Sequence, residues 1–252
     1  MYTLKKERRT ILLAGIITLF LFSVFVSLQF ISFKTEFEYE PYEDGVRLVN
    51  YYQSVSDDTT RLEIPEFVDG KPVVAIGARA FLGCDKLQHI IIPESVRAIG
   101  GYAFSDCSAL VSIKIPDKVT EIRGGTFFDC TSLKTVTLTD SITVIHGEAF
   151  KNCSSLTEIT LPENITEIRG NTFEGCSSLK AIEIPEGVWR IGGHAFYECS
   201  SLNSVKMPHS LRKIGSSAFR RCPKLYTIEI PYNTDVNIRA FKESPTSIHY
   251  FY

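Results

Sequence analysis

The chain has 252 residues, a formal net charge of -2 at pH 7 and 22% charged residues. This length and balance are typical of one repeat domain with one additional segment. They exclude a strongly basic nucleic-acid-binding protein, and no basic stripe with interleaved aromatic residues is present, so we expect no nucleic-acid partner.

The N-terminal region contains a long uncharged segment. Residues 10–33 carry no charged side chain and are rich in leucine, isoleucine and phenylalanine. A helix over this segment would be about 36 Å long and would cross a bilayer. Basic residues precede it in the tail 1–9 and acidic residues follow it, which predicts a cytoplasmic N-terminus. We therefore expect a single-pass cell-membrane protein whose repeats lie outside the cytoplasm.

Two other interpretations of residues 10–33 remain. One is a cleaved signal peptide, because a basic stretch precedes the apolar residues. The apolar region of a signal peptide is normally shorter, about 7 to 15 residues, and no site with small residues for cleavage follows here. The other is a buried core helix.

Residues 35–63 are predicted to form an N-terminal β-hairpin cap. Phe37 and Tyr39 alternate with polar residues before Asp44-Gly45, and Val46 and Leu48 alternate after it. This pattern is typical of two strands joined by a tight turn. Such a hairpin would cover the apolar end and the open strand edge of the domain that follows.

The rest of the chain, residues 64–252, repeats a unit of 23 residues. Its seven cysteines recur at this interval, with phenylalanine three residues before each and leucine three residues after: Cys84, Cys107, Cys130, Cys153, Cys176, Cys199 and Cys222. A regular period of this length indicates a solenoid. Since Phe241 follows Phe219 by 22 residues and Ser244 replaces the cysteine, we expect a shortened C-terminal cap.

Each unit contains one clear alternation of apolar and polar residues, as in Val136-Thr137-Leu138. Alternation with period two predicts one short strand per unit. Proline usually follows this strand and glycine lies farther on, which indicates a coil with corners. A single coil has no core of its own, so stacked coils would share one core and join their strands into one parallel sheet.

The run from Cys84 to Phe104 has the form C-x-x-L-x-x-I-x-I-P-x-x-V-x-x-I-G-x-x-A-F. It resembles the BspA-type leucine-rich repeat. The resemblance covers about residues 64–241 and implies a β-rich solenoid, a right-handed coil with one parallel sheet, here preceded by the transmembrane helix. It also implies binding of other macromolecules at a cell surface and no catalytic residues. Six positions depart from the pattern: Thr139 replaces a proline, Arg123, His146 and Arg169 replace the first glycine, and Thr126 and Thr172 replace the alanine.

The cysteines are predicted to be buried free thiols. Their number is odd, and cysteine packs as a small apolar residue in the place that cysteine or asparagine fills in leucine-rich repeats. Disulfides between adjacent coils and metal binding are the alternatives. The five histidines occupy different positions of the repeat, and a zinc site needs three or four converging ligands. We expect no cofactor, no metal and, since no catalytic motif is present, no enzyme.

The outward positions of the predicted strands form two columns, on the face where solenoids usually bind partners. The candidate binding residues in them are His89, Ile91, Lys114, Thr137, Glu158, Thr160, Glu183, Lys206 and Glu229. The only tryptophan, Trp189, lies outside these columns. An isolated large aromatic could anchor a ligand. It could equally stack on Arg212 of the next coil.

These observations predict a membrane-anchored binding module for a protein or glycan ligand, with adhesion or recognition at the cell surface as its function. The adhesion role is implied by the resemblance alone. The alternative is a structural component of the cell envelope, a spacer or self-pairing rod without a foreign ligand. Asn152 and Asn164 begin sequences of the N-glycosylation type, which the repeat could also produce by accident.

Overall fold

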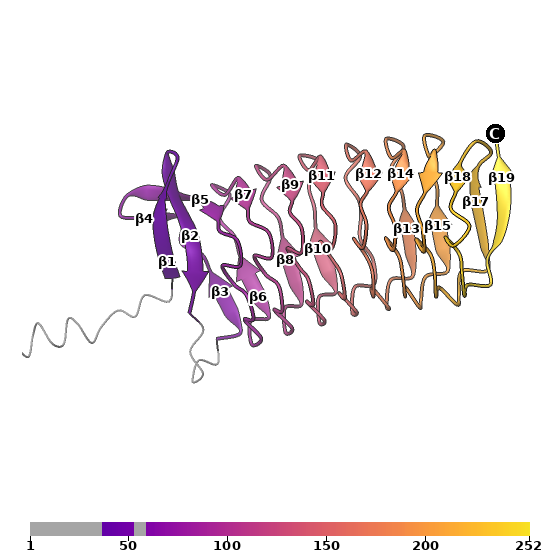
Figure 1. Ribbon diagram of the computed structural model, residues 1–252. Coiled ribbons are helices and arrows are strands. Elements are labelled where there is room, and N and C mark those ends of the chain that lie inside the picture. The colour runs from indigo at the N-terminus through magenta and orange to yellow at the C-terminus, as the bar shows by residue number, and fades with distance from the viewer. Residues whose placement is uncertain (1–36, 53–58) are drawn as a thin grey trace, which may run out of the picture. The chain divides into compact units, whose positions relative to one another are not determined.

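The computed structural model describes residues 37–52 and 59–252, which belong to one compact unit. This unit is a rod of stacked coils made of strands and turns (Figure 1). The tail 1–9 and the predicted transmembrane helix 10–33 lie outside the described residues. Within the described ranges, no helix is long and apolar enough to cross a membrane.

At its N-terminal end the rod carries an antiparallel hairpin of β1 (Phe37–Tyr42) and β2 (Gly45–Tyr51). Strand β2 pairs in parallel with β5 (Lys71–Ile76), which also pairs with the short β4 (Phe67–Val68). Gly45 is required at the turn, because a Cβ atom there would lie 2.3 Å from the Pro72 carbonyl oxygen. The hairpin thus lies directly against the first coil.

A first row of strands runs along the rod. Its members are β3 (Arg61–Glu63), β6 (His89–Ile91), β8 (Ser112–Lys114), β10 (Thr135–Thr137), β13 (Ala181–Glu183), β15 (Ser204–Lys206), β17 (Thr227–Pro231) and β19 (Ser247–Phe251). All hydrogen-bonded pairs in it are parallel and in register, for example Lys114 beside Thr137. The parallel sheet predicted from the alternating residues is therefore present, but it is divided into three hydrogen-bonded parts.

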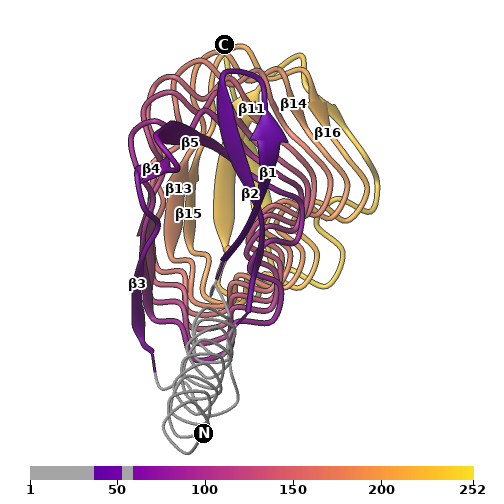
Figure 2. The same cartoon turned by 90° about the vertical axis from the view of Figure 1, so that its left-hand side faces the viewer.

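A second row of strands lies on the other side of the coils (Figure 2). Besides β5, its members are β7 (Ala98–Ile99), β9 (Glu121–Ile122), β11 (Val144–Ile145), β12 (Glu167–Ile168), β14 (Arg190–Ile191), β16 (Lys213–Ile214) and β18 (Asp235–Val236). The prediction of one strand per unit and one sheet was therefore wrong. Each of these strands is only two residues long, too short to show a period-two pattern.

The second row is interrupted next to two of the departures from the repeat. The first-glycine position of the repeat leaves no room for a side chain when neighbouring strands pair. At Gly192, for example, a Cβ atom would lie 2.5 Å from the Gly170 nitrogen. Arg123 and Arg169 carry a Cβ atom at the equivalent position, and β7–β9 and β11–β12 are not paired. His146 differs, because its backbone N–H still donates to the Ile122 oxygen at 2.9 Å.

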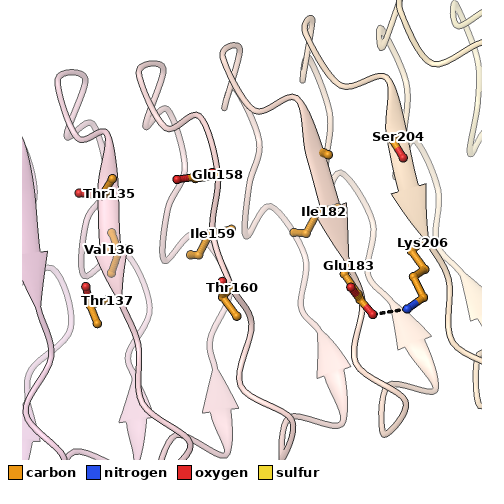
Figure 3. Close-up of a pocket in the computed structure, with 11 residues that line it drawn as sticks. Thr135, Val136, Thr137, Glu158, Ile159, Thr160, Ile182, Glu183, Ser204 and Lys206 are labelled. Atoms are coloured by element: carbon orange, nitrogen blue, oxygen red, sulfur yellow. Dashed lines mark hydrogen bonds and ion pairs between the residues drawn. The ribbon is translucent and has the colours of Figure 1, made fainter.

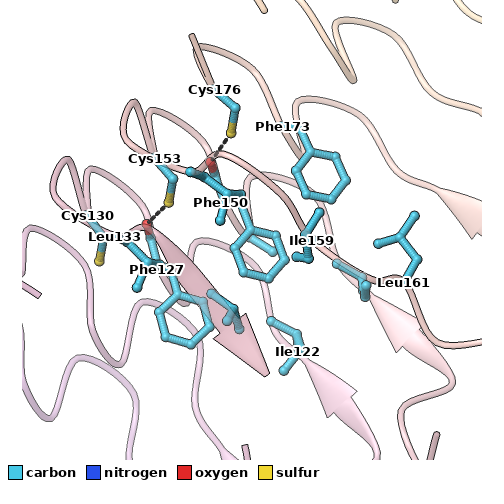
Figure 4. Packing of buried hydrophobic residues seen from close by; sticks show 14 of the residues in the cluster. Ile122, Phe127, Cys130, Leu133, Phe150, Cys153, Ile159, Leu161, Phe173 and Cys176 are labelled. Atoms are coloured by element: carbon cyan, nitrogen blue, oxygen red, sulfur yellow. Dashed lines mark hydrogen bonds between the residues drawn. The ribbon is translucent and has the colours of Figure 1, made fainter. Parts of the chain in front are cut away.

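The core is a set of continuous ladders through the middle of the rod (Figure 4). Adjacent phenylalanine rings from Phe81 to Phe241 lie with centroids 5.1–5.6 Å apart and planes within 13° of parallel. Tyr51 of the hairpin extends this ladder, with its ring 5.5 Å from that of Phe81. Stacked coils therefore share one core, as predicted from the repeat.

Candidate functional site

Nine of the ten candidate binding residues lie on the outer face of the first strand row. Along the row, these outward residues alternate with residues whose side chains are buried in the core: Ile90, Ile113, Val136, Ile159, Ile182, Val205 and Ile228. Parallel pairing in register brings equivalent residues of successive coils together, so Glu183 lies beside Lys206. His89 lies beside Ser112, with its Nδ1 atom 3.2 Å from the hydroxyl oxygen.

Three open depressions lie along this face. The widest has a volume of about 480 Å³ and spans four coils, from Thr135 to Lys206 (Figure 3). Its lining includes the small side chains of Thr137, Thr160 and Ala181. A depression of about 260 Å³ lies toward the N-terminal end and shares Thr135 with the central one. Another, of about 320 Å³, lies toward the C-terminal end and shares Lys206 with it. Together they form one shallow surface along the first row.

The floor of the central depression contains an irregular segment. Residues 158–160 occupy the place of a strand but form none, and the first row is divided on both sides of them. Within the described residues, the backbone N–H groups of Ile159 and Leu161 have no backbone partner. Thr139, which replaces proline at the start of this coil, has a buried hydroxyl without a hydrogen-bond partner. The backbone ladder of the first row is therefore interrupted at the coil that forms the floor of this depression.

Charged side chains on the face are arranged in pairs between coils. Lys114 Nζ lies 2.8 Å from the Glu94 carboxylate, and Lys206 pairs with Glu183. The Lys114 ammonium holds the pKa of Glu94 below its usual value, and the Glu183 carboxylate raises the pKa of Lys206. These pairs are exposed, so each contributes little to stability and both partners stay available to a ligand.

One edge of the face is lined by acidic residues that lie outside the two outward columns predicted from the sequence. They follow the proline position of successive coils and are exposed: Glu94, Asp117, Asp140, Glu163 and Glu186. The signal was present in the sequence, because an acidic residue recurs there at the 23-residue interval. Carboxylates on the face and this edge outnumber the lysines and arginines there, which makes the surface acidic.

Trp189 lies on the other side of the coils, directly before β14, and its side chain is 47% exposed. It does not stack on Arg212. Instead, Arg212 Nη1 donates to the backbone oxygens of His209 and Leu211 at 2.7 and 2.8 Å. Trp189 is therefore separate from the surface formed by the other nine candidates.

A polar network occupies the second strand row. Glu121 accepts hydrogen bonds from Arg123 at 2.8 Å and from His146 at 3.1 Å. Arg169 in turn donates to the other ring nitrogen of His146 and to Glu167. The Arg123 guanidinium and His146 hold the pKa of Glu121 below its usual value. Because its members satisfy one another, we interpret this network as a structural link between coils.

The seven cysteines are free and buried, as predicted. From Cys107 onward, each thiol donates to the backbone oxygen of the phenylalanine 26 residues earlier, at 3.0–3.2 Å. Ser244 makes the same bond to the Phe219 oxygen at 2.6 Å. The cysteine column thus ties each coil to the one before it. Among the described residues, no group of three or more histidine, cysteine or acidic side chains is placed to hold a metal ion.

Comparison with known proteins identifies the repeats. A family model described as "BspA type Leucine rich repeat region" matches residues 58–171 and 125–248. The chain is 31% identical to a leucine-rich repeat protein of T. pallidum, covering 77% of this chain and 90% of that one with a TM-score of 0.69. A leucine-rich repeat protein of Bacteroides ovatus is 30% identical, with 80% and 59% covered and a TM-score of 0.63. This chain thus spans less than two thirds of the B. ovatus protein. No curated protein sequence matches it.

Proposed function

Because the chain belongs to the BspA-type leucine-rich repeat family, we propose that it binds a protein ligand on the face of the first strand row. The observation that carries this proposal is the shallow surface formed by the three overlapping depressions. A long open surface on a rigid stack of coils suits a macromolecule better than a small enclosed ligand.

The acidic character of this surface favours a partner with lysine and arginine side chains. Complementary charge increases the rate of association and excludes acidic competitors. The columns from residue 61 to residue 229 hold no tyrosine, tryptophan or phenylalanine on their outward positions. Aromatic rings are the usual platform for sugars, so a protein ligand is preferred to a glycan.

The cellular setting is part of the same proposal. Residues 10–33 act as an uncleaved transmembrane anchor with the tail 1–9 in the cytoplasm and the repeats outside it. The supporting observation is the charge difference across the uncharged segment. In this orientation the acidic surface meets ligands outside the cell, which gives the protein a role in adhesion or recognition. The alternative is a structural envelope component that recognises no foreign ligand.

The binding surface is tested by placing a large charged side chain in the central depression. We expect Ala181→Arg to weaken capture of the ligand by at least about tenfold, because the exposed alanine lines this depression and the new side chain fills it. Immobilised fragment 35–252 would be incubated with envelope extracts and matrix proteins, and bound proteins identified by mass spectrometry.

Thr166→Arg is the matched control, since Thr166 is exposed on the second row and should leave capture unchanged. Equal capture by Ala181→Arg and the unchanged fragment would exclude the first row as the binding surface. Loss of capture after glycosidase treatment of the extract would identify a glycan ligand and contradict the protein assignment.

The orientation is tested separately by proteolysis of intact cells. We expect added protease to remove the repeats while an epitope at the N-terminus stays protected, because the basic tail remains inside. Immunoblots with antibodies to both ends of the chain would show whether the repeats are digested and whether the N-terminus stays intact. Repeats that survive in intact cells but are digested after lysis would contradict the proposed orientation.

A further inference from the structure

The only tryptophan of the chain lies on an uninterrupted part of the second strand row. Strands β12, β14, β16 and β18 pair in sequence to form one sheet there, and β14 and β16 occupy its middle (Figure 2). The backbone N–H of Trp189 donates to the Thr166 oxygen at 3.0 Å, and the Trp189 oxygen accepts from the Arg212 N–H at 2.8 Å. Bonds to both neighbouring coils fix the backbone here, so the side chain is presented from a rigid support.

The Trp189 side chain is not needed to cover the core. Val188 and Ile191 of the same segment are fully buried, whereas Trp189 is 47% exposed. Unlike Tyr197, over which Arg221 lies at 5.7 Å, Trp189 makes no cation–π or aromatic ring contact with any described residue. The neighbouring coils hold threonine and arginine at the equivalent position. A half-exposed tryptophan that the repeat does not require is typical of an anchor at an interface.

Three cationic side chains lie in the same two coils of the row. Arg190 lies beside Lys213 in the paired strands, and Lys213 forms no ion pair within the described residues. The Arg212 Nη1 atom is held by the backbone oxygens of His209 and Leu211 at 2.7 and 2.8 Å, not by a carboxylate. Its guanidinium is therefore oriented without being neutralised, and its other N–H groups can donate to a ligand. These side chains form the basic patch: Trp189, Arg190, Arg212 and Lys213.

The carboxylates next to the basic patch do not neutralise it. Glu167 pairs with Arg190 at 3.3 Å but also with Arg169 at 2.8 Å, so its charge is shared between two cations. Asp235 lies beside Lys213 in the paired strands. Cations thus outnumber carboxylates in this part of the second row, whereas carboxylates are in excess on the first-row surface.

We propose that the basic patch binds an acidic segment of a partner protein, in which carboxylates flank an apolar side chain. The apolar side chain packs on Trp189, and the carboxylates accept hydrogen bonds from Arg212 and Lys213. The patch lies on the other side of the coils from the first-row surface. This partner is therefore distinct from the basic ligand proposed for that surface.

The small extent of the basic patch favours a short segment over other anionic partners. Its cations belong to two successive coils, which are about 5 Å apart. Carboxylates follow on both sides: Glu163 and Glu167 in the coil before, and Asp235 in the coil after. Glu186 lies in the turn beside Trp189, where it accepts from the His209 N–H at 2.9 Å. A nucleic-acid strand or an anionic membrane carries charge over a longer distance and would be repelled by these carboxylates.

The binding can be measured directly, because the emission of the single tryptophan reports on the patch alone. The full chain in an uncharged detergent is titrated with a capped peptide that has two glutamates on each side of a leucine. We expect a saturable change in Trp189 emission. The same peptide with glutamine in place of glutamate should bind at least about tenfold more weakly, because it lacks the charges. Added salt should weaken binding of the glutamate peptide, because exposed charges are screened.

Two variants separate the roles of charge and ring. Lys213→Gln keeps the reporter and should weaken binding of the glutamate peptide about three- to fivefold, as expected for one exposed ion pair. Lys134→Gln is the matched control, since this exposed lysine directly before β10 lies on the first-row side and should leave the titration unchanged. Trp189→Ala, measured by calorimetry, should weaken binding at least about tenfold through loss of the anchor.

Several results would overturn the proposal: an emission that the glutamate peptide does not change, equal affinity for the glutamine peptide, or equal weakening by Lys213→Gln and Lys134→Gln. Vesicles of phosphatidylcholine and phosphatidylserine, or an oligothymidine strand, that bind more tightly than the peptide would also overturn it and identify a membrane or a nucleic acid as the partner.

Discussion

Replacing Phe150 with alanine is expected to lower the free energy of unfolding by about 3 to 5 kcal/mol. The ring is fully buried and lies between Phe127 and Phe173, with centroids 5.5 and 5.4 Å away. Its removal leaves a cavity that contacts two neighbouring coils. Chemical denaturation of fragment 35–252 would measure the loss, and hydrogen exchange should show reduced protection in the coils on both sides of Phe150.

Phe241→Ala is the matched comparison, because it deletes the same ring from the end of the ladder. Phe241 is only partly buried and stacks on Phe219 alone, at 5.3 Å. We expect about half the cost and a loss of protection confined to the last coil, since each coil contacts only its neighbours. Equal and global destabilisation by both substitutions would contradict a stack of coils that share nearest-neighbour interfaces.

The 23-residue period was sufficient to predict the core, because a ladder needs only that equivalent residues recur. Phenylalanine, cysteine and leucine do so throughout, and the BspA-type resemblance is confirmed by the comparisons. The same period predicted which residues share the outer face of the first row. It could not predict the depressions, whose depth depends on how closely neighbouring strands approach.

The features that sequence reasoning missed are those in which one coil differs from the next. Residues 158–160 have the same alternation as the other strands yet form none. The pairing of Lys114 with Glu94 depends on side-chain conformations in two coils. Arg212 donates hydrogen bonds to backbone oxygens near its own coil and does not stack on Trp189. The repeat pattern is the same for every coil, so it cannot predict contacts and strands that differ from one coil to the next.

The burial of the cysteine column leads to the second prediction with a large expected effect, which concerns the rate of thiol alkylation. We expect Cys153 in fragment 35–252 to react with iodoacetamide at pH 8 at least about a thousandfold more slowly than in the unfolded chain. Two causes act together. The thiol is buried and donates to the Phe127 oxygen at 3.1 Å, and burial raises the pKa of Cys153 well above its usual value, which suppresses the reactive thiolate. Labelling then requires unfolding that costs several kcal/mol.

Cys222 should react with iodoacetamide faster than Cys153. It lies next to the shortened last coil, where Ser244 donates to its neighbour Phe219 in place of a further cysteine. Burial raises the pKa of Cys222 to about 12, so it too is protected while the last coil stays folded. Fraying of that coil exposes Cys222 without opening the centre of the rod. Mass spectrometry of peptides after timed labelling would give both rates, and all seven cysteines should react in denaturant. Rapid labelling of Cys153 under native conditions would contradict the packed ladder, and so would a mass deficit from disulfides in the denatured chain.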